Sequence, residues 1–285
     1  MSPASARALA LVLALTTLAG CGGSAATDSD TISITVTRDF GAQDVVALPR
    51  EPVPAEGGLA DILQRHSSTR AAESLFVNGI AADEPAGELT VHGGDRIWLD
   101  RHAGGVARAI PAVVGSFPEP FLHGVDGKRL PVRVECDDPR AGACAAVAEK
   151  LVSLGVVAGR SVISRSAADE TVRILVAPWT RLRGREFEAD RLDAGPRESG
   201  VHARFDASAR RLLVLDAAGN VARTLGAGTG LIAATRVTDR RPVWFVTGTD
   251  AAGVASAARA LDESVLADRF ALAVSDDLPV AVPQP

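Results

Sequence analysis

Tyrosine is absent from this sequence of 285 residues, and lysine occurs only twice, as Lys128 and Lys150, among 30 basic residues. Aromatic residues make up 4% of the chain. Because sugar-binding surfaces usually use exposed aromatic faces, this shortage disfavours a glycan-binding module. The net charge is −5, whereas binding to the phosphates of nucleic acid requires a basic surface. The composition therefore argues against both glycans and nucleic acid as partners.

Long apolar runs are also lacking, because no segment approaches the ~20 apolar residues that a membrane-spanning helix needs. Near the N-terminus, the single basic residue Arg7 precedes a short apolar run at residues 8–15. A basic start, a short apolar segment and small residues at a cleavage site are typical of a secretory signal peptide. Since hydrophobic residues make up 47% of the chain, we expect the rest to fold around a core.

The sequence Leu-Ala-Gly-Cys at residues 18–21 resembles the cleavage site of bacterial lipoproteins. The resemblance implies that residues 1–20 are a signal peptide and that Cys21 carries acyl chains such as palmitate. The lipid bilayer is then a partner, each buried methylene contributing ~0.8 kcal/mol, on the extracytoplasmic face of the cell membrane. Residues 21–30 have the composition of a flexible tether. The alternative is a chance cysteine after an ordinary signal peptide.

Two cysteines remain besides Cys21, namely Cys136 and Cys144. An even number of cysteines in an oxidising compartment favours a disulfide, and we expect these two to close the short loop between them. Two free buried thiols are the alternative. No second cysteine or histidine pair stands at a spacing typical of metal ligands, so we expect no metal site.

Residues 31–102 have the pattern of a small sheet over one helix. Polar and apolar residues alternate over residues 32–36, which predicts a half-buried strand, and apolar residues recur at helical spacing over residues 59–66. Asn78-Gly79 between apolar residues predicts a hairpin, because both turn positions need a positive φ angle. Further strands are expected at residues 45–48, 75–77, 89–91 and 96–100, with a loop at residues 49–58.

Three segments of this region, residues 34–41, 76–80 and 93–98, resemble the β-grasp domain that is similar to the C-terminal domain of transcobalamin. They read Ile-Thr-Val-Thr-Arg-Asp-Phe-Gly, Phe-Val-Asn-Gly-Ile and Gly-Gly-Asp-Arg-Ile-Trp. The resemblance implies a β-grasp fold for residues 31–102. In transcobalamins this domain closes over one face of a corrinoid, and bacterial lipoproteins that carry it are often associated with vitamin uptake systems. It therefore implies a role beside a membrane transporter, in the uptake of a small molecule such as a corrinoid.

Residues 103–129 connect this domain to the rest of the chain. Two prolines flank Glu119, with Phe117 and Phe121 outside them. Proline fixes φ and removes an N–H donor, which predicts a stiff, extended crossing. The segment is either a hydrophobic strap that packs two domains together or a loop that binds a ligand at their interface, where small-molecule sites are common. In the second interpretation, Phe117, Phe121 and His123 are the candidate ligand contacts.

Residues 130–280 alternate between expected strands and helices, which predicts a mixed-sheet α/β domain. With the first domain, this gives an α+β protein. Asp138-Pro139 has the form of a helix cap followed by a first-turn proline, and residues 276–285 are expected to form a proline-containing tail, with residues 281–285 outside the domain. The expected strands lie at residues 132–136, 172–176, 201–205, 212–215, 221–225, 243–246 and 270–274, and expected helices begin near residues 140, 179 and 251.

Residues 226–230, Gly-Ala-Gly-Thr-Gly, form a glycine-rich turn that we expect to open an apolar helix at residues 231–233. Backbone N–H groups of such a turn can bind a phosphate or carboxylate, which makes Gly228 and Thr229 candidate ligand-binding residues. The turn lacks the lysine of a P-loop and the full Rossmann spacing, and close packing is the alternative. The arginines of residues 181–185 present a similar choice between an anion site and a surface paired with neighbouring acids.

No catalytic constellation is visible. The histidines do not stand at metal-ligand spacing, and neither a Gly-x-Ser-x-Gly elbow nor a free cysteine is present, so we expect no catalytic residues and no cofactor. We therefore interpret the chain as a non-enzymatic, membrane-anchored lipoprotein that binds a small-molecule ligand. The alternatives are a protein-interaction module that docks on a membrane transporter or envelope partner, and an enzyme that uses the turn at residues 226–230.

Overall fold

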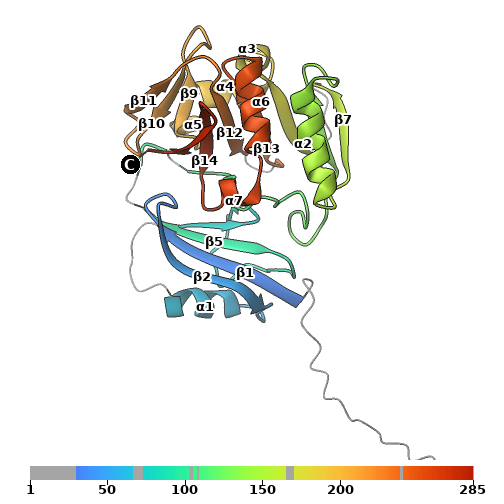
Figure 1. Cartoon of the computed structure of the whole chain (residues 1–285). Coiled ribbons are helices and arrows are strands. Elements are labelled where there is room, and N and C mark those ends of the chain that lie inside the picture. Colours follow the sequence, from blue (N-terminus) through green and yellow to red (C-terminus); the bar gives the residue numbers. More distant parts are fainter. Residues whose placement is uncertain are drawn as a thin grey trace, which may run out of the picture.

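The computed structural model describes residues 30–66, 73–102, 105–107, 109–164, 170–237 and 240–284. It contains β-sheets of five, three and seven strands, and the fold class is α+β, as predicted. Figure 1 shows the small sheet and its helix α1 below a larger body that contains the other two sheets. The expected signal peptide, Cys21 and all of the tether except its last residue lie outside the described residues.

The five-stranded sheet has the order β2-β1-β5-β3-β4, with β1 and β5 parallel and the other neighbours antiparallel. Its elements are β1 (Thr31–Arg38), β2 (Gln43–Pro52), α1 (Gly58–His66), β3 (Glu73–Val77), β4 (Ile80–Ala81) and β5 (Arg96–Arg101). The predicted hairpin is confirmed, because Asn78 and Gly79 join β3 to β4 with φ angles of 54° and 75°.

Two details of the predicted first domain are wrong. Strand β2 continues to Pro52, through the first part of the expected loop, and residues 89–91 form no strand. Leu89 and Val91 nevertheless pack into the core of the small sheet. Their apolar character therefore reflects burial of an irregular segment and not strand pairing.

The two faces of the small sheet have different partners. Ile32, Ile34 and Val36 of β1 pack with Leu59 and Leu63 of α1, which covers the outer face in Figure 1. Successive side chains of a strand point to opposite faces. The serine and threonines that alternate with these apolar residues therefore point toward the larger body.

The seven-stranded sheet has the order β15-β14-β12-β13-β8-β6-β7. Strands β7, β6, β8 and β13 are parallel, whereas β12, β14 and β15 pair antiparallel. Helices α2 and α6 cover one face, and α3, α4 and the sheet β11-β10-β9 cover the other. The elements are β6 (Val132–Cys136), α2 (Gly142–Ser153), β7 (Ala158–Val162), β8 (Val172–Pro178), α3 (Trp179–Leu182), α4 (Phe187–Asp193), α5 (Pro196–Ser199), β9 (Ala203–Phe205), β10 (Leu212–Leu215), β11 (Val221–Leu225), β12 (Gly230–Thr235), β13 (Val243–Gly248), α6 (Ala251–Arg259), α7 (Glu263–Leu266), β14 (Ala271–Ser275) and β15 (Leu278–Val282).

Three predicted features of the larger domain are wrong. Residues 231–233 lie in strand β12 and not in a helix, because this strand is buried on both faces and its apolar run therefore lacks a strand period. Residues 278–282 form β15, antiparallel to β14, within the expected tail. Helix α2 begins at Gly142, and Asp138 instead accepts a hydrogen bond from the backbone N–H of Arg140 (2.9 Å) in the preceding turn.

Cys136 and Cys144 form the predicted disulfide, with 6.1 Å between their Cα atoms. The bond joins the end of β6 to the first turn of α2, whose Val147 and Leu151 are buried in the same core. A disulfide that closes so short a loop contributes roughly 2–3 kcal/mol to stability.

Candidate functional site at the domain junction

The connector does not cross between the domains in the extended form that its prolines predicted. Residues 115–121 follow consecutive turns. The rings of Phe117 and Phe121 lie against Trp244 of β13, with ring centres 6.1 Å and 4.9 Å away. Both rings are buried in the core of the larger domain. The structure thus places two of our candidate ligand contacts inside a packed core.

His123, the third candidate in the connector, lies partly exposed at the junction. Its ring Nδ1 is 2.6 Å from the carboxylate of Glu119, which is buried and also accepts a hydrogen bond from the His123 backbone N–H (2.9 Å). The hydrogen bond that the His123 ring makes to the Glu119 carboxylate raises the pKa of His123. The ring lies over Gly94, where a Cβ atom would be 2.6 Å from it, so this close approach requires glycine.

A buried amide and carboxylate, Asn78 and Asp95, tie the hairpin to the connector. The Asn78 amide donates to Asp95 Oδ1 (2.7 Å) and to the Gly124 carbonyl (3.1 Å), and its oxygen accepts from the Arg96 N–H (2.9 Å). Burial raises the pKa of Asp95, although hydrogen bonds from His92 and Asn78 oppose the shift. The pair therefore forms a fixed polar floor between the two domains.

A cleft of about 200 Å³ opens above this floor. Arg236 and Arg241, from the larger domain, line it together with Asp83, Glu84 and other acids from the small domain and connector. Arg236 donates to Asp83 (2.9 Å), but its buried Nε atom has no hydrogen-bond partner in the described part of the chain. The cleft therefore presents both signs of charge. Its lining also includes Val77, Asn78, Ile80, Ala81, Ala82, Leu89, Thr90, Asp95, Val125 and Asp126.

Aromatic side chains join the two domains beside this cleft. Phe270, immediately before β14, contacts Trp98, Phe40, Phe76 and His102 of the small domain, with ring centres 5.0, 5.2, 5.7 and 5.7 Å away. Aromatic pairs at such separations add to the effect of area burial. The domains therefore share an apolar seam.

A buried carboxylate, Asp100, organises the polar groups behind the seam. It accepts hydrogen bonds from the Thr37 hydroxyl (2.5 Å) and the Gly41 N–H (2.9 Å), and it lies 2.7 Å from Nδ1 of His102. The indole N–H of Trp98 donates to the Thr37 hydroxyl (2.8 Å). Asp100 thereby fixes the orientation of His102 at the seam.

His202 reaches the same seam from the larger domain, with its ring centre 5.5 Å from that of Phe40. It is 1% exposed, and neither ring nitrogen has a hydrogen-bond partner of normal geometry among the described residues. The backbone of nearby Ala217 favours the protonated form of His202 and so raises its pKa. The Ala217 oxygen, however, already accepts a hydrogen bond from the Val106 N–H (2.8 Å). Burial, and secondarily the charge of His102, lowers the pKa of His202 to about 4. His202 is therefore neutral at pH 7.

The glycine-rich turn packs tightly against α6. The Gly228 N–H donates to Asp250 (2.8 Å), and the Thr229 N–H donates to the Thr249 hydroxyl (3.2 Å). Asp250 also caps α6 through the Gly253 N–H (2.9 Å). Because the Asp250 carboxylate takes the place that an anionic ligand would need, the geometry supports the close-packing interpretation of this turn.

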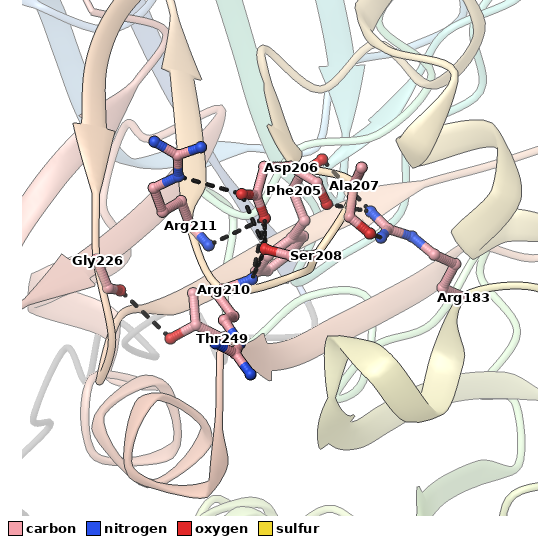
Figure 2. Close-up of polar contacts among 9 residues, drawn as sticks. All are labelled: Arg183, Phe205, Asp206, Ala207, Ser208, Arg210, Arg211, Gly226 and Thr249. Atoms are coloured by element: carbon pink, nitrogen blue, oxygen red, sulfur yellow. Dashed lines mark hydrogen bonds and ion pairs between the residues drawn. The ribbon is translucent and has the colours of Figure 1, made fainter.

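The arginines that follow β8 are engaged by neighbouring groups. Arg183 forms an ion pair with Asp193 and donates to backbone oxygens of residues 205–207. Figure 2 shows its side chain beside the loop between β9 and β10. Arg181 pairs with Asp137 (2.9 Å). For Arg183, these contacts support the interpretation of a surface paired with its own acids, whereas Arg181 makes a single exposed pair.

Sequence patterns did not identify Asp95, Arg236 or His202 as site residues. Asp95 follows two glycines in a turn, which indicated only a change of chain direction. Arg236 comes directly after the buried strand β12, and recognising that strand would have placed an arginine at its end. His202 stands alone before a short strand, and no pattern around it signals burial.

Comparisons with protein families, with curated proteins and with solved structures found no match for this chain. Within the described residues, no group of three or more His, Cys, Asp or Glu side chains is arranged to hold a metal ion. The same part of the chain contains no helix with the length and apolar character to cross a membrane.

Proposed function

We propose that this protein is a non-enzymatic lipoprotein, anchored through Cys21 to the extracytoplasmic face of the cell membrane, that binds a small ligand in the junction cleft. The observation that carries the proposal is the placement of both signs of charge around a cleft between two domains, where small-molecule sites are common. The disulfide fits an oxidising compartment outside the cytoplasm.

The dimensions of the cleft favour a ligand of few heavy atoms. Its volume of about 200 Å³ lies below the range of about 300–1,000 Å³ that is typical of sites for drug-sized ligands. A corrinoid is a large macrocycle and would contact the protein mainly outside this cleft. A small zwitterion, with one cationic and one anionic group, matches the acids and arginines of the two walls. The proposed role is accessory binding of such a molecule for uptake by a membrane transporter.

In the protein-interaction alternative, a partner protein would pair with strand β2, which pairs only with β1 in the described sheet. Its outer end carries the residues Pro49, Arg50, Glu51 and Pro52, and its pairing with β1 is interrupted by two irregularities. Prolines, charges and bulges all discourage a further strand from pairing with a sheet edge. We therefore favour the ligand-binding proposal.

Replacing Cys21 with serine should move the protein from the membrane fraction to the soluble fraction, because serine removes the attachment point of the acyl chains that bind the bilayer. Metabolic labelling with palmitate, followed by cell fractionation, measures both effects. The matched control replaces Cys136 and Cys144 with serine and should keep the label. A wild-type chain without label would contradict the anchor.

Glycine and β-alanine, as zwitterionic probes, should bind the full-length chain in detergent more tightly than acetate or methylamine, because only the zwitterions engage both walls of the cleft. The double variant Asp83→Asn, Arg236→Gln should weaken this binding about tenfold, which corresponds to ~1.4 kcal/mol. Isothermal titration calorimetry measures the affinities, with cobalamin as a separate arm.

The matched control for this cleft variant is Asp277→Asn with Arg259→Gln. These two residues form an exposed Arg–Asp ion pair (2.6 Å) that does not line the cleft. The control should bind the probes like the wild-type chain. Equal binding of acetate and glycine, or an unchanged affinity in the cleft variant, would argue against the proposed site.

A further inference from the structure

The larger domain has a reversal in strand order beside its parallel edge. The chain runs from β6 through α2 to β7 on one side, and it then returns to β8 on the other side of β6. All three strands are parallel, so their carboxyl ends lie at the same end of the sheet. Where successive connections leave a parallel sheet in opposite directions, a crevice opens outside the carboxyl ends, and ligands commonly bind there.

A crevice of about 290 Å³ lies at this position. Each of the three strands contributes to it at its carboxyl end. Asp137 follows β6, Val162 ends β7 and Ile163 follows it. Arg181, Arg185 and Glu186 come from the segment after β8. The crevice and the junction cleft have no lining residue in common. The inference therefore stands independently of the proposed function.

Glu186, which lines the crevice, belongs to a charge network with Arg173 and Glu135. One guanidinium nitrogen of Arg173 lies 2.7 Å from the carboxylate of Glu135 and 2.9 Å from that of Glu186. Arg133 lies 3.7 Å from the other oxygen of Glu135. The Glu186 carboxylate is thus turned inward and compensated, so it does not oppose an anion at the mouth of the crevice.

Two arginines and an apolar wall line the mouth. The Arg181 side chain is 51% exposed and pairs with Asp137, which is itself partly exposed. Such exposed pairs are weak and exchange readily for another anion. Arg185 supplies a second guanidinium, and Val162 is 60% exposed beside them. A planar guanidinium suits the oxygens of a carboxylate or phosphate, and an exposed valine suits an apolar body.

We propose that this crevice binds a small organic anion, with its carboxylate or phosphate on Arg181 and Arg185 and its apolar part on Val162 and Ile163. The ligand replaces or shares the Asp137 carboxylate at Arg181. The buried network beneath keeps β6 and the segment after β8 in place, so the site is formed before the ligand arrives.

Titration of the full-length chain in detergent with phenyl phosphate, benzoate, inorganic phosphate and benzyl alcohol tests the proposal. Phenyl phosphate or benzoate should bind about tenfold more tightly than benzyl alcohol and inorganic phosphate, because only these two carry both required groups. The tighter of the two organic anions identifies the phosphate or carboxylate class. Equal binding of benzyl alcohol, or no binding of either organic anion, would overturn the proposal.

The double variant Arg181→Gln, Arg185→Gln should lose about tenfold in affinity for the tighter probe. The control, Arg197→Gln with Arg204→Gln, removes the same charge from two exposed arginines on α5 and β9 and should keep wild-type affinity. A Val162→Ser variant should weaken the organic anions without affecting inorganic phosphate. Circular dichroism and thermal melting establish that each variant is folded. Equal losses in the arginine variant and its control would refute a specific site.

Discussion

Replacing Arg173 with methionine should lower the free energy of unfolding by about 3–5 kcal/mol, the usual result of removing one partner from a buried ion network. Glu135 is fully buried on β6, Glu186 is nearly so, and both carboxylates bond to this one guanidinium. Burial opposes the charge on Arg173, but the two acids together raise its pKa. Methionine fills a similar volume and leaves both acids without their shared cation. Urea denaturation at pH 7 measures the loss.

The matched control for this prediction is Arg181→Met. Arg181 also pairs with an aspartate, Asp137, but both side chains are partly exposed, and such pairs contribute only about 0–1 kcal/mol. Adding Glu135→Leu and Glu186→Leu to Arg173→Met should recover most of the stability, because a packed apolar triad replaces buried charge at little cost. A loss below about 1 kcal/mol in Arg173→Met would show that the acids are hydrated or protonated.

Acidification from pH 7 to pH 4 should lower the free energy of unfolding by about 3 kcal/mol through His202 alone. The unfolded chain binds a proton at this residue near pH 6.5, whereas the folded chain binds it only near pH 4. The stabilising contribution of neutral His202 is therefore complete above about pH 6.5, and it decreases as the pH falls from about 6.5 to about 4. The charged groups that influence His202 are His102, which disfavours its protonation, and Asp216, which favours it.

Comparison with His202→Phe isolates this effect, because phenylalanine keeps a ring beside Phe40 and removes the titration. Other groups titrate equally in both proteins. His123, for example, has a raised pKa and therefore loses its stabilising contribution as the pH increases, which is opposite to the effect of His202. Denaturation curves at pH 7, 6, 5 and 4 should show the smaller acid sensitivity in His202→Phe. Parallel curves for wild type and His202→Phe would contradict the assignment.

Local patterns predicted several features correctly. The hairpin at Asn78 and Gly79 follows from the positive φ angles that these two residues tolerate. The bond between Cys136 and Cys144 follows from two cysteines a short distance apart in a chain whose first residues predict export. Each depends on residues that are near one another in sequence, so no knowledge of the fold was needed.

Patterns failed where burial on two faces removed the expected period. The run at residues 231–233 is apolar and follows glycines, which predicts a helix, but it belongs to the interior strand β12. Glu135 of β6 and Arg173 of β8 alternate with apolar residues, a pattern typical of a half-exposed strand, yet both are buried and bonded to each other. A single strand carries no information about what will cover its second face.

The sequence by itself determined the α+β class, most strands of the small sheet and the disulfide, and it predicts a lipidated Cys21, because each depends on short-range periodicity or on a motif. The tertiary structure alone decided where charge gathers. It brought Asp83 within 2.9 Å of Arg236 and joined Arg173 to Glu135 and Glu186. These contacts link distant parts of the chain, and their partners are selected by sheet order and domain packing, which no local pattern contains.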